Sequence, residues 1–251
     1  MKIKVRYLMV LFTVVLIGLS AGCSVPQKDG QKKGEAKKVV INLIELGEKM
    51  NIPVEEVVIP NGNKVKVQEW NKEHIKRAIT ELNYCFNEPQ NTYLLTESPD
   101  PWVTLALIEA LQPLKVLYLY PRADGVELDM CELKKGQQTP NYDVVFEIVQ
   151  EGDNVFINLN SDRPEATTIG HHTFETGNLC KVVIPEIPAG KHVFVHGKGM
   201  YCVMVCVARN YVKNSKSVSL ASHDTDYTCA VSYTDEREIG DVTPRTLKNN
   251  L

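Results

Sequence analysis

One segment of the chain combines residue types that can bind an anion, and it comes directly before a predicted helix. Gly197, Lys198 and Gly199 follow His196 at the end of an apolar run, and the helical stretch 202–212 comes next. Glycines at a helix N-terminus present backbone N–H groups and a lysine adds positive charge, so this segment can bind an anion. A plain tight turn is the alternative, because Gly-Lys-Gly is short and common.

A second polar cluster follows the next predicted strand in each half of the chain. It is Tyr120-Pro121-Arg122-Ala123-Asp124-Gly125 in the first half and Ser222-His223-Asp224-Thr225-Asp226 in the second. Loops that leave strands at one edge of a sheet converge, so we expect these clusters to face the Gly-Lys-Gly segment. The candidate ligand-binding residues are therefore His196, Gly197, Lys198, Gly199, Tyr120, Arg122, Ser222, His223 and Asp224.

The sequence contains no strong signal for catalysis or for a metal. His223, Asp224 and Asp226 have metal-binding side chains, but three such residues within five loop positions arise often. His192 and His196 point to the same side of a predicted strand, yet they lie ~13 Å apart at 3.3 Å per residue, too far for one ion. The motifs of serine hydrolases, zinc proteases, P-loops and dinucleotide sites are missing from the sequence. We therefore assign no catalytic residue, no metal and no cofactor.

The elements that must position these segments occur twice in the same order. Each half is predicted to contain a hairpin, a variable segment, a strand, a helix and two more strands. In the first half these elements are 54–59 with 64–68, then 92–96, 102–111, 116–120 and 126–130. In the second half they are 143–149 with 155–159, then 191–196, 202–212, 217–221 and 228–234. The offset between matching elements grows steadily from 91 to 104 residues, as loop insertions would produce.

We therefore predict an α/β fold of two small tandem repeats, residues 39–141 and 142–251, each with helices packed on a sheet. The near-uniform apolarity of 102–111 and 202–207 indicates that these helices are buried. Asn71 and Asp100 are predicted to cap helices, while 39–52 fits either a strand or a docking helix. Two homologous copies would pack about a pseudo-twofold axis, giving a monomer with a pseudo-dimeric core or a homodimer.

The N-terminus has the features of an export signal. Three basic residues within the first six precede an apolar run of 13 residues, which is too short to span the ~30 Å hydrocarbon core of a bilayer. The small residues before Cys23 resemble the lipobox of bacterial lipoproteins, although Ser20 stands where the usual Leu would be. This resemblance implies removal of a signal peptide, residues 1–22, and attachment of lipid to Cys23.

The segment after Cys23 is predicted to be a flexible tether. Residues 23–38 contain almost no apolar side chains, so they cannot bury enough surface to offset the entropy of ordering. Their five lysines would favour an anionic lipid surface, and a merely soluble spacer is the alternative. Three of the 28 basic residues lie in the signal, which leaves 25 against 31 acidic residues. An acidic body argues against binding to duplex nucleic acid.

Cysteine usage is compatible with an exported protein. Besides Cys23 there are six cysteines, and an even number in an exported chain permits disulfides without showing which residues pair. Their spacings match no zinc pattern. We expect several of them to be buried small hydrophobic residues.

The second half also resembles a known family. Ile187-Pro188, the run Val193–Gly199, the apolar helix ending at Tyr211 and the closing segment Glu238–Val242 are similar to the small CRISPR-associated ring nucleases. In the first half, Tyr118–Arg122 with Gly125-Val126 carries the same resemblance. These enzymes bind cyclic tetra-adenylate between two subunits and cleave it with manganese.

The departures from that family concern its catalytic residues. The position of its catalytic Asp is Tyr120 in the first copy and Ser222 in the second, and its histidine falls near Gln112 and Val212. We therefore expect the scaffold without the chemistry. The predicted function is a non-catalytic binding module for a ligand or envelope partner, lipid-anchored to the cell membrane or outer membrane. The alternative is a ring-nuclease-like phosphodiesterase or a sensor of cyclic oligoadenylate, with manganese as its cofactor.

Overall fold

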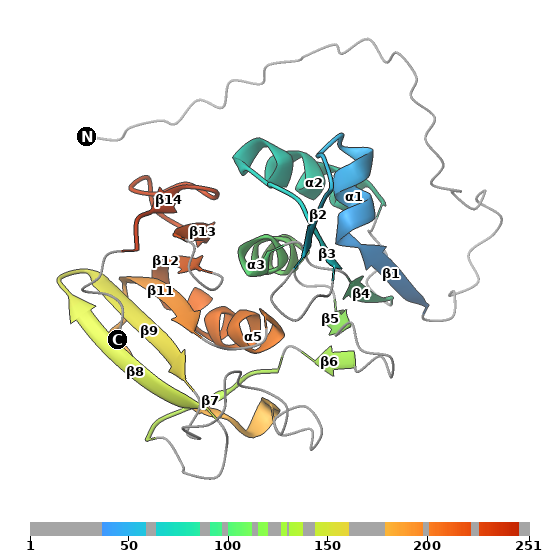
Figure 1. Ribbon diagram of the computed structural model, residues 1–251. Coiled ribbons are helices and arrows are strands. Elements are labelled where there is room, and N and C mark those ends of the chain that lie inside the picture. The colour runs from blue at the N-terminus through green and yellow to red at the C-terminus, as the bar shows by residue number, and fades with distance from the viewer. Residues whose placement is uncertain are drawn as a thin grey trace, which may run out of the picture. The chain divides into compact units, whose positions relative to one another are not determined.

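The computed structural model describes residues 37–58, 64–85, 91–96, 100–111, 115–119, 127–129, 131–137, 144–160, 179–197, 201–221 and 226–245. The predicted signal peptide, Cys23 and most of the tether lie outside these residues. Within the described part of the chain, no helix combines the length and apolarity needed to cross a membrane. The α/β fold class is confirmed, with helices packed on two main sheets (Figure 1).

The first sheet has four strands, and its three interstrand pairings run parallel, parallel and antiparallel. In spatial order its strands are β1 (Lys38–Asn42), β4 (Thr92–Thr96), β5 (Lys115–Leu119) and β6 (Glu127–Asp129). Helix α1 (Leu43–Lys49) follows β1 directly, so the ambiguous segment 39–52 forms both a strand and a helix. Helix α2 (Lys72–Cys85) precedes β4, and α3 (Pro101–Ala110) connects β4 to β5.

The second sheet has six strands and contains the described residues of the candidate site. In spatial order they are β14 (Val242–Thr243), β13 (Tyr227–Ser232), β12 (Ser215–Leu220), β11 (Lys191–Gly197), β9 (Asn154–Asn160) and β8 (Val145–Glu151). Strand β11 pairs parallel with both β9 and β12, and helix α5 (Tyr201–Val212) connects β11 to β12. Strand β11 has parallel neighbours on both sides and is buried from His192 to His196.

The two sheets share a run of strands with the same order and directions. The run β1-β4-β5-β6 matches β9-β11-β12-β13, with a helix between the second and third strands in each. The predicted match between the two hairpins is wrong. Strands β8 and β9 belong to the second sheet, whereas β2 (Glu55–Val58) and β3 (Lys64–Val67) form a sheet of their own. The tandem duplication and its pseudo-twofold axis stay predictions.

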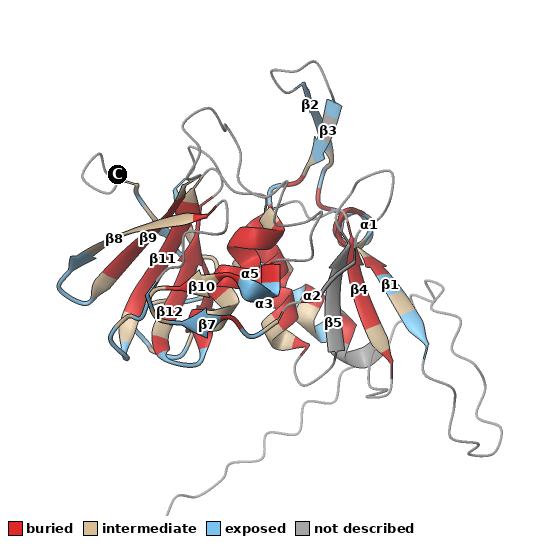
Figure 2. Cartoon of the chain, turned by 90° about the horizontal axis from the view of Figure 1, so that it is seen from below, coloured by how far each residue is buried: buried red, intermediate tan, exposed pale blue. Residues whose placement is uncertain are grey.

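Helices α3 and α5 are buried, as their apolar sequences predicted. Figure 2 shows both helices almost entirely in the colour of buried residues, and they contact each other. Helix α3 also contacts β13, and α5 packs against β11 and β12. The buried side chains of both sheets and both helices form one continuous cluster, so the two predicted repeats share a core. One ion pair crosses the helix contact, from Arg209 Nε to Glu109 Oε1 at 3.2 Å.

The predicted helix caps are confirmed. Asn71 Oδ1 accepts the backbone N–H of His74 at 3.0 Å at the start of α2, and Asp100 Oδ1 accepts that of Trp102 at 3.3 Å at the start of α3. Pro101 occupies the first turn of α3. These contacts satisfy N–H groups that have no partner within the helix.

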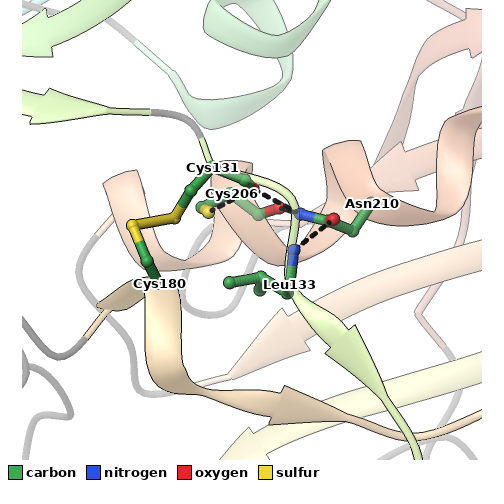
Figure 3. The surroundings of a disulfide bond; sticks show 5 residues. All are labelled: Cys131, Leu133, Cys180, Cys206 and Asn210. Atoms are coloured by element: carbon green, nitrogen blue, oxygen red, sulfur yellow. Dashed lines mark hydrogen bonds between the residues drawn. A yellow bond between two sulfur atoms is a disulfide. The ribbon is translucent and has the colours of Figure 1, made fainter.

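A disulfide joins Cys131 to Cys180, a pairing that the sequence left open (Figure 3). It lies beside a small parallel sheet of β7 (Lys134–Lys135) and β10 (Val183–Ile184), next to the short 3-10 helix η1 (Leu179–Lys181). Asn210 on α5 holds the same segment, because its side chain donates to the Cys131 carbonyl and accepts the Leu133 N–H. Cys202, Cys206 and Cys229 are buried free thiols, as expected.

Candidate functional site

The candidate site is built on the alternating side chains of β11. Val193 and Val195 point to the inner face of the second sheet and join the main core beneath α5. His192, Phe194 and His196 occupy the alternate positions and point to the opposite face, which we call the outer face. Both histidines are buried. A buried polar side chain needs hydrogen-bond partners, so the contacts of each imidazole call for an explanation.

His196 is the buried polar group that lacks a full set of partners. Its side chain is 2% exposed, and its Nδ1 atom lies 2.9 Å from the hydroxyl of Tyr227 on β13. The two rings meet edge to face, with centroids 5.6 Å apart. Among the described residues, Nε2 of His196 has no hydrogen-bond partner. Burial, together with the positive charge of Arg245, lowers the pKa of His196 to about 4, so the imidazole is neutral at pH 7.

A row of polar side chains continues from His196 across the sheet. Asn158 on β9 is in register with His196, and Glu147 on β8 is in register with Asn158. The amides of Asn158 and Asn160 both donate to Oε2 of Glu147, each at 2.9 Å. The carboxylate of Glu147 is therefore held by amides, two strands away from the imidazole.

Gly197 ends β11 in a conformation that glycine favours. Its φ is +146°, and a Cβ atom at this position would lie 2.1 Å from the carbonyl oxygen of Leu159 on β9. The sequence identified Gly197 as a residue that presents its N–H to an anion. The structure supplies a packing reason for the glycine, since any side chain here would collide with the neighbouring strand.

The structure does not describe the other candidate residues, but it does describe the strands that they follow. Lys198 and Gly199 come directly after β11, and Ser222, His223 and Asp224 come after β12. These strands are parallel neighbours with Val195 opposite Leu220, so both strands end at the same edge of the sheet. We call this the carboxyl edge of the second sheet. Tyr120 and Arg122 follow β5, which belongs to the first sheet.

Asp226 lies directly before β13 and belongs to the described residues. Its Oδ1 atom accepts the backbone N–H of Arg245 at 2.9 Å. Asp226 therefore holds the end of the C-terminal segment beside Tyr227, the next residue along the chain. Sequence reasoning considered Asp226 only as a metal ligand and missed this contact.

Two residues of the C-terminal segment, 233–245, contact the outer face, and these contacts were not anticipated from the sequence. Glu236 Oε2 lies 2.8 Å from Nε2 of His192, and Arg237 lies over the ring of Phe194. Arg245 is close enough to lower the pKa values of both His196 and Tyr227 by its charge. We call this segment the strap.

His192, on the same strand, has a hydrogen-bond partner at each ring nitrogen. Its Nδ1 atom lies 2.7 Å from the hydroxyl of Ser217, and its Nε2 atom is bound by Glu236. A serine, a histidine and a carboxylate in contact invite comparison with a nucleophilic triad. Glu236 belongs to the C-terminal segment, however, and Ser217 lies on β12, so the three groups join that segment to two strands of the sheet. We therefore interpret this set as the attachment of the strap to the sheet.

Neither the protein-family models nor the curated proteins include a match to this chain. Function must therefore be argued from the residues themselves.

Proposed function

We propose that this protein is an exported, lipid-anchored binding protein whose ligand or envelope partner engages the carboxyl edge of the second sheet. The observation that carries the proposal is the orphan Nε2 atom of His196. A buried polar atom without a partner costs free energy of about 1–3 kcal/mol, so its retention calls for an explanation. A ligand that completes the hydrogen bond provides one.

The position of His196 supports the same function. In open sheets with parallel strands, ligands bind outside the carboxyl ends of the strands, where the connecting loops converge. His196 is the penultimate residue of β11, and two of the candidate segments leave β11 and β12 beside it. One of these segments contains Lys198, which would add a positive charge.

Export is supported by the disulfide as well as by the signal. Disulfides form and persist in oxidising compartments outside the cytoplasm. Cys180 is exposed and Cys131 is partly exposed, so reductants in a cytoplasm would reach this bond. Together with the lipobox before Cys23, this favours a protein held by lipid on the exported side of a membrane.

The proposed function is binding without catalysis. The ring-nuclease-like alternative rests on the sequence resemblance, and Tyr120 and Ser222, the positions of the family's catalytic Asp, lie outside the described residues. Ser217 and His192, the one described pair that resembles catalytic machinery, serve the strap.

A thermal-shift screen tests the proposal with two matched variants. The full-length chain would be melted with a panel of oxyanions, nucleotides, sugars and peptides. A ligand present at a hundred times its Kd adds about 2.7 kcal/mol of stability, and this is visible as a rise in Tm of several degrees. We expect His196→Leu to lose the rise, while Val58→Ala, at an exposed position of the separate β2–β3 sheet, keeps it.

Two outcomes of the screen would contradict the proposal. One is a panel in which no compound stabilises the wild type. The other is a set of hits that stabilise His196→Leu as much as the wild type, because those compounds would bind away from the carboxyl edge.

A further inference from the structure

The contact between Tyr227 and His196 determines which imidazole nitrogen carries the proton. A neutral imidazole has one N–H donor and one acceptor nitrogen. If Tyr227 donates its hydroxyl proton to Nδ1, both groups in that contact are satisfied and the ring proton lies on Nε2. If Nδ1 donated instead, the buried tyrosine proton would itself need another acceptor. The arrangement with fewer unsatisfied groups places N–H on Nε2.

The orphan atom of His196 is therefore a donor, and its partner must be an acceptor. A donor on Nε2 offers no lone pair to a metal ion, so this nitrogen does not serve as a metal ligand in this state. An oxygen acceptor is the usual partner of such a donor.

The charges around His196 indicate that this acceptor is negatively charged. The bond from the Arg245 N–H to Asp226 Oδ1 holds Arg245 next to Tyr227, and the charge of Arg245 lowers the pKa values of both His196 and Tyr227. Glu147, the nearest carboxylate along the row, is separated from the imidazole by β9 and has its oxygen bound by two amides. A buried N–H beside a guanidinium stabilises an anion more than a neutral carbonyl oxygen.

We propose that the carboxyl edge of the second sheet binds an oxyanion, a phosphate or carboxylate group of the ligand, through the Nε2–H of His196. This inference rests on the proposed binding function and names the chemistry of its ligand. Tyr227 is a positioning residue, because it holds the proton on Nε2 without contacting the ligand.

Histidine NMR on the full-length chain tests the protonation state and the ligand class together. With ¹⁵N-labelled histidine, long-range proton–nitrogen spectra distinguish protonated from unprotonated ring nitrogens. We expect His196 to show a protonated Nε2 at pH 7. Inorganic phosphate and acetate, added separately, should shift the Nε2 signal of His196. The signal of His192, whose nitrogens are both occupied, serves as the internal control.

Two variants measure the contribution of each group to phosphate binding. His196→Leu should weaken binding by about 10- to 100-fold, the value of one hydrogen bond to a charged group. Tyr227→Phe leaves the imidazole in place but removes the hydroxyl, so the Nε2 proton should become partly displaced to Nδ1 and binding should weaken. Proper folding of both variants would be checked by an unchanged His192 signal.

The outcomes separate this inference from the proposed function. An Nε2 signal that stays constant with phosphate and acetate, as a site filled by water would give, overturns the oxyanion. If a neutral ligand from the thermal-shift panel still depended on His196, the binding function would stand with a different ligand class. If phosphate bound but His196→Leu had no effect, the site would be elsewhere and both proposals would be contradicted. A difference between phosphate and acetate would show which oxyanion the site prefers.

Discussion

Arg237 lies with its guanidinium carbon 4.9 Å from the centre of the Phe194 ring, and this contact places the strap directly on the outer face of the second sheet. Phe194 also stacks on Phe156 with centroids 4.8 Å apart, and its edge contact with Tyr227 completes an aromatic cluster. The strap therefore covers apolar surface that would otherwise face water. It also brings its last described residue, Arg245, to the candidate site.

Removing the Arg237 side chain should loosen the strap. A cation over a buried aromatic ring contributes about 1–2 kcal/mol, so Arg237→Ala should lower the free energy of unfolding by that amount in urea denaturation. The strap should also lose protection from hydrogen exchange, while α3 and α5 stay protected. Arg237→Lys keeps the charge and should lose less. Equal exchange of the strap in wild type and Arg237→Ala would contradict this role.

The pKa of His196 makes a prediction for acid stability. The pKa is about 6.5 in the unfolded chain and about 4 in the folded one, so the unfolded state binds more protons between these values. The contribution of His196 to the free energy of unfolding is fully present above pH 6.5. It should fall by up to about 3 kcal/mol as the pH drops to 4. His196→Leu should lack this loss.

A second group titrates in the same range with the opposite sign. Burial raises the pKa of Asp100 from 3.8 to about 7, so between these pH values the folded state binds more protons than the unfolded state. Asp100 therefore raises the free energy of unfolding as the pH falls. The useful measurement is therefore the difference between wild type and His196→Leu across pH 4–7, in which Asp100 cancels. A difference that does not change with pH would contradict the pKa assigned to His196.

The disulfide should contribute measurably to stability. Cys131 and Cys180 are 49 residues apart, and closing a loop of that length stabilises the folded state by about 2–4 kcal/mol. Cys131→Ser, Cys180→Ser and the double variant should therefore all lower the free energy of unfolding by similar amounts. Reduction with dithiothreitol should do the same to the wild type and nothing to the double variant. Additive losses from the two single variants would show that the residues act separately.

Local features of this fold were predictable from the sequence, and features made by distant residues were not. The burial of α3 and α5 followed from their apolar composition, and the caps Asn71 and Asp100 from their positions. The hairpin β2–β3 was also predicted, but alternation of side chains does not say which sheet a hairpin joins. Its separation from the first sheet therefore had to come from the structure.

The candidate site shows the same division. Sequence reasoning selected His196 for its place beside Gly-Lys-Gly, yet its chemistry depends on Tyr227, 31 residues away. The pairing of Cys131 with Cys180 and the contact of Arg237 with Phe194 are of the same kind. Spacing within one chain does not reveal such contacts, because they depend on how strands and loops pack.

The lipid anchor makes a prediction that can be checked in cells. The lipobox before Cys23 implies acylation of that cysteine, so Cys23→Ala should abolish labelling with a fatty-acid probe and release the protein from membrane fractions. Cys229→Ala is the matched control, because Cys229 is a buried free thiol and should not affect labelling. Undiminished labelling of Cys23→Ala would show that the protein is not a lipoprotein of this type.

The last prediction is that the chain does not cleave cyclic tetra-adenylate with manganese. Ring cleavage requires stabilisation of charge on the phosphoryl oxygens, and hard cations such as manganese prefer carboxylate ligands. The family's catalytic Asp position holds Tyr120 or Ser222 here, and a phenol with a pKa of about 10 stays neutral at pH 7. Purified protein incubated with radiolabelled ring and manganese should therefore give no linear product. Multiple-turnover cleavage lost in the double variant Lys198→Ala with Arg122→Ala would instead establish the phosphodiesterase.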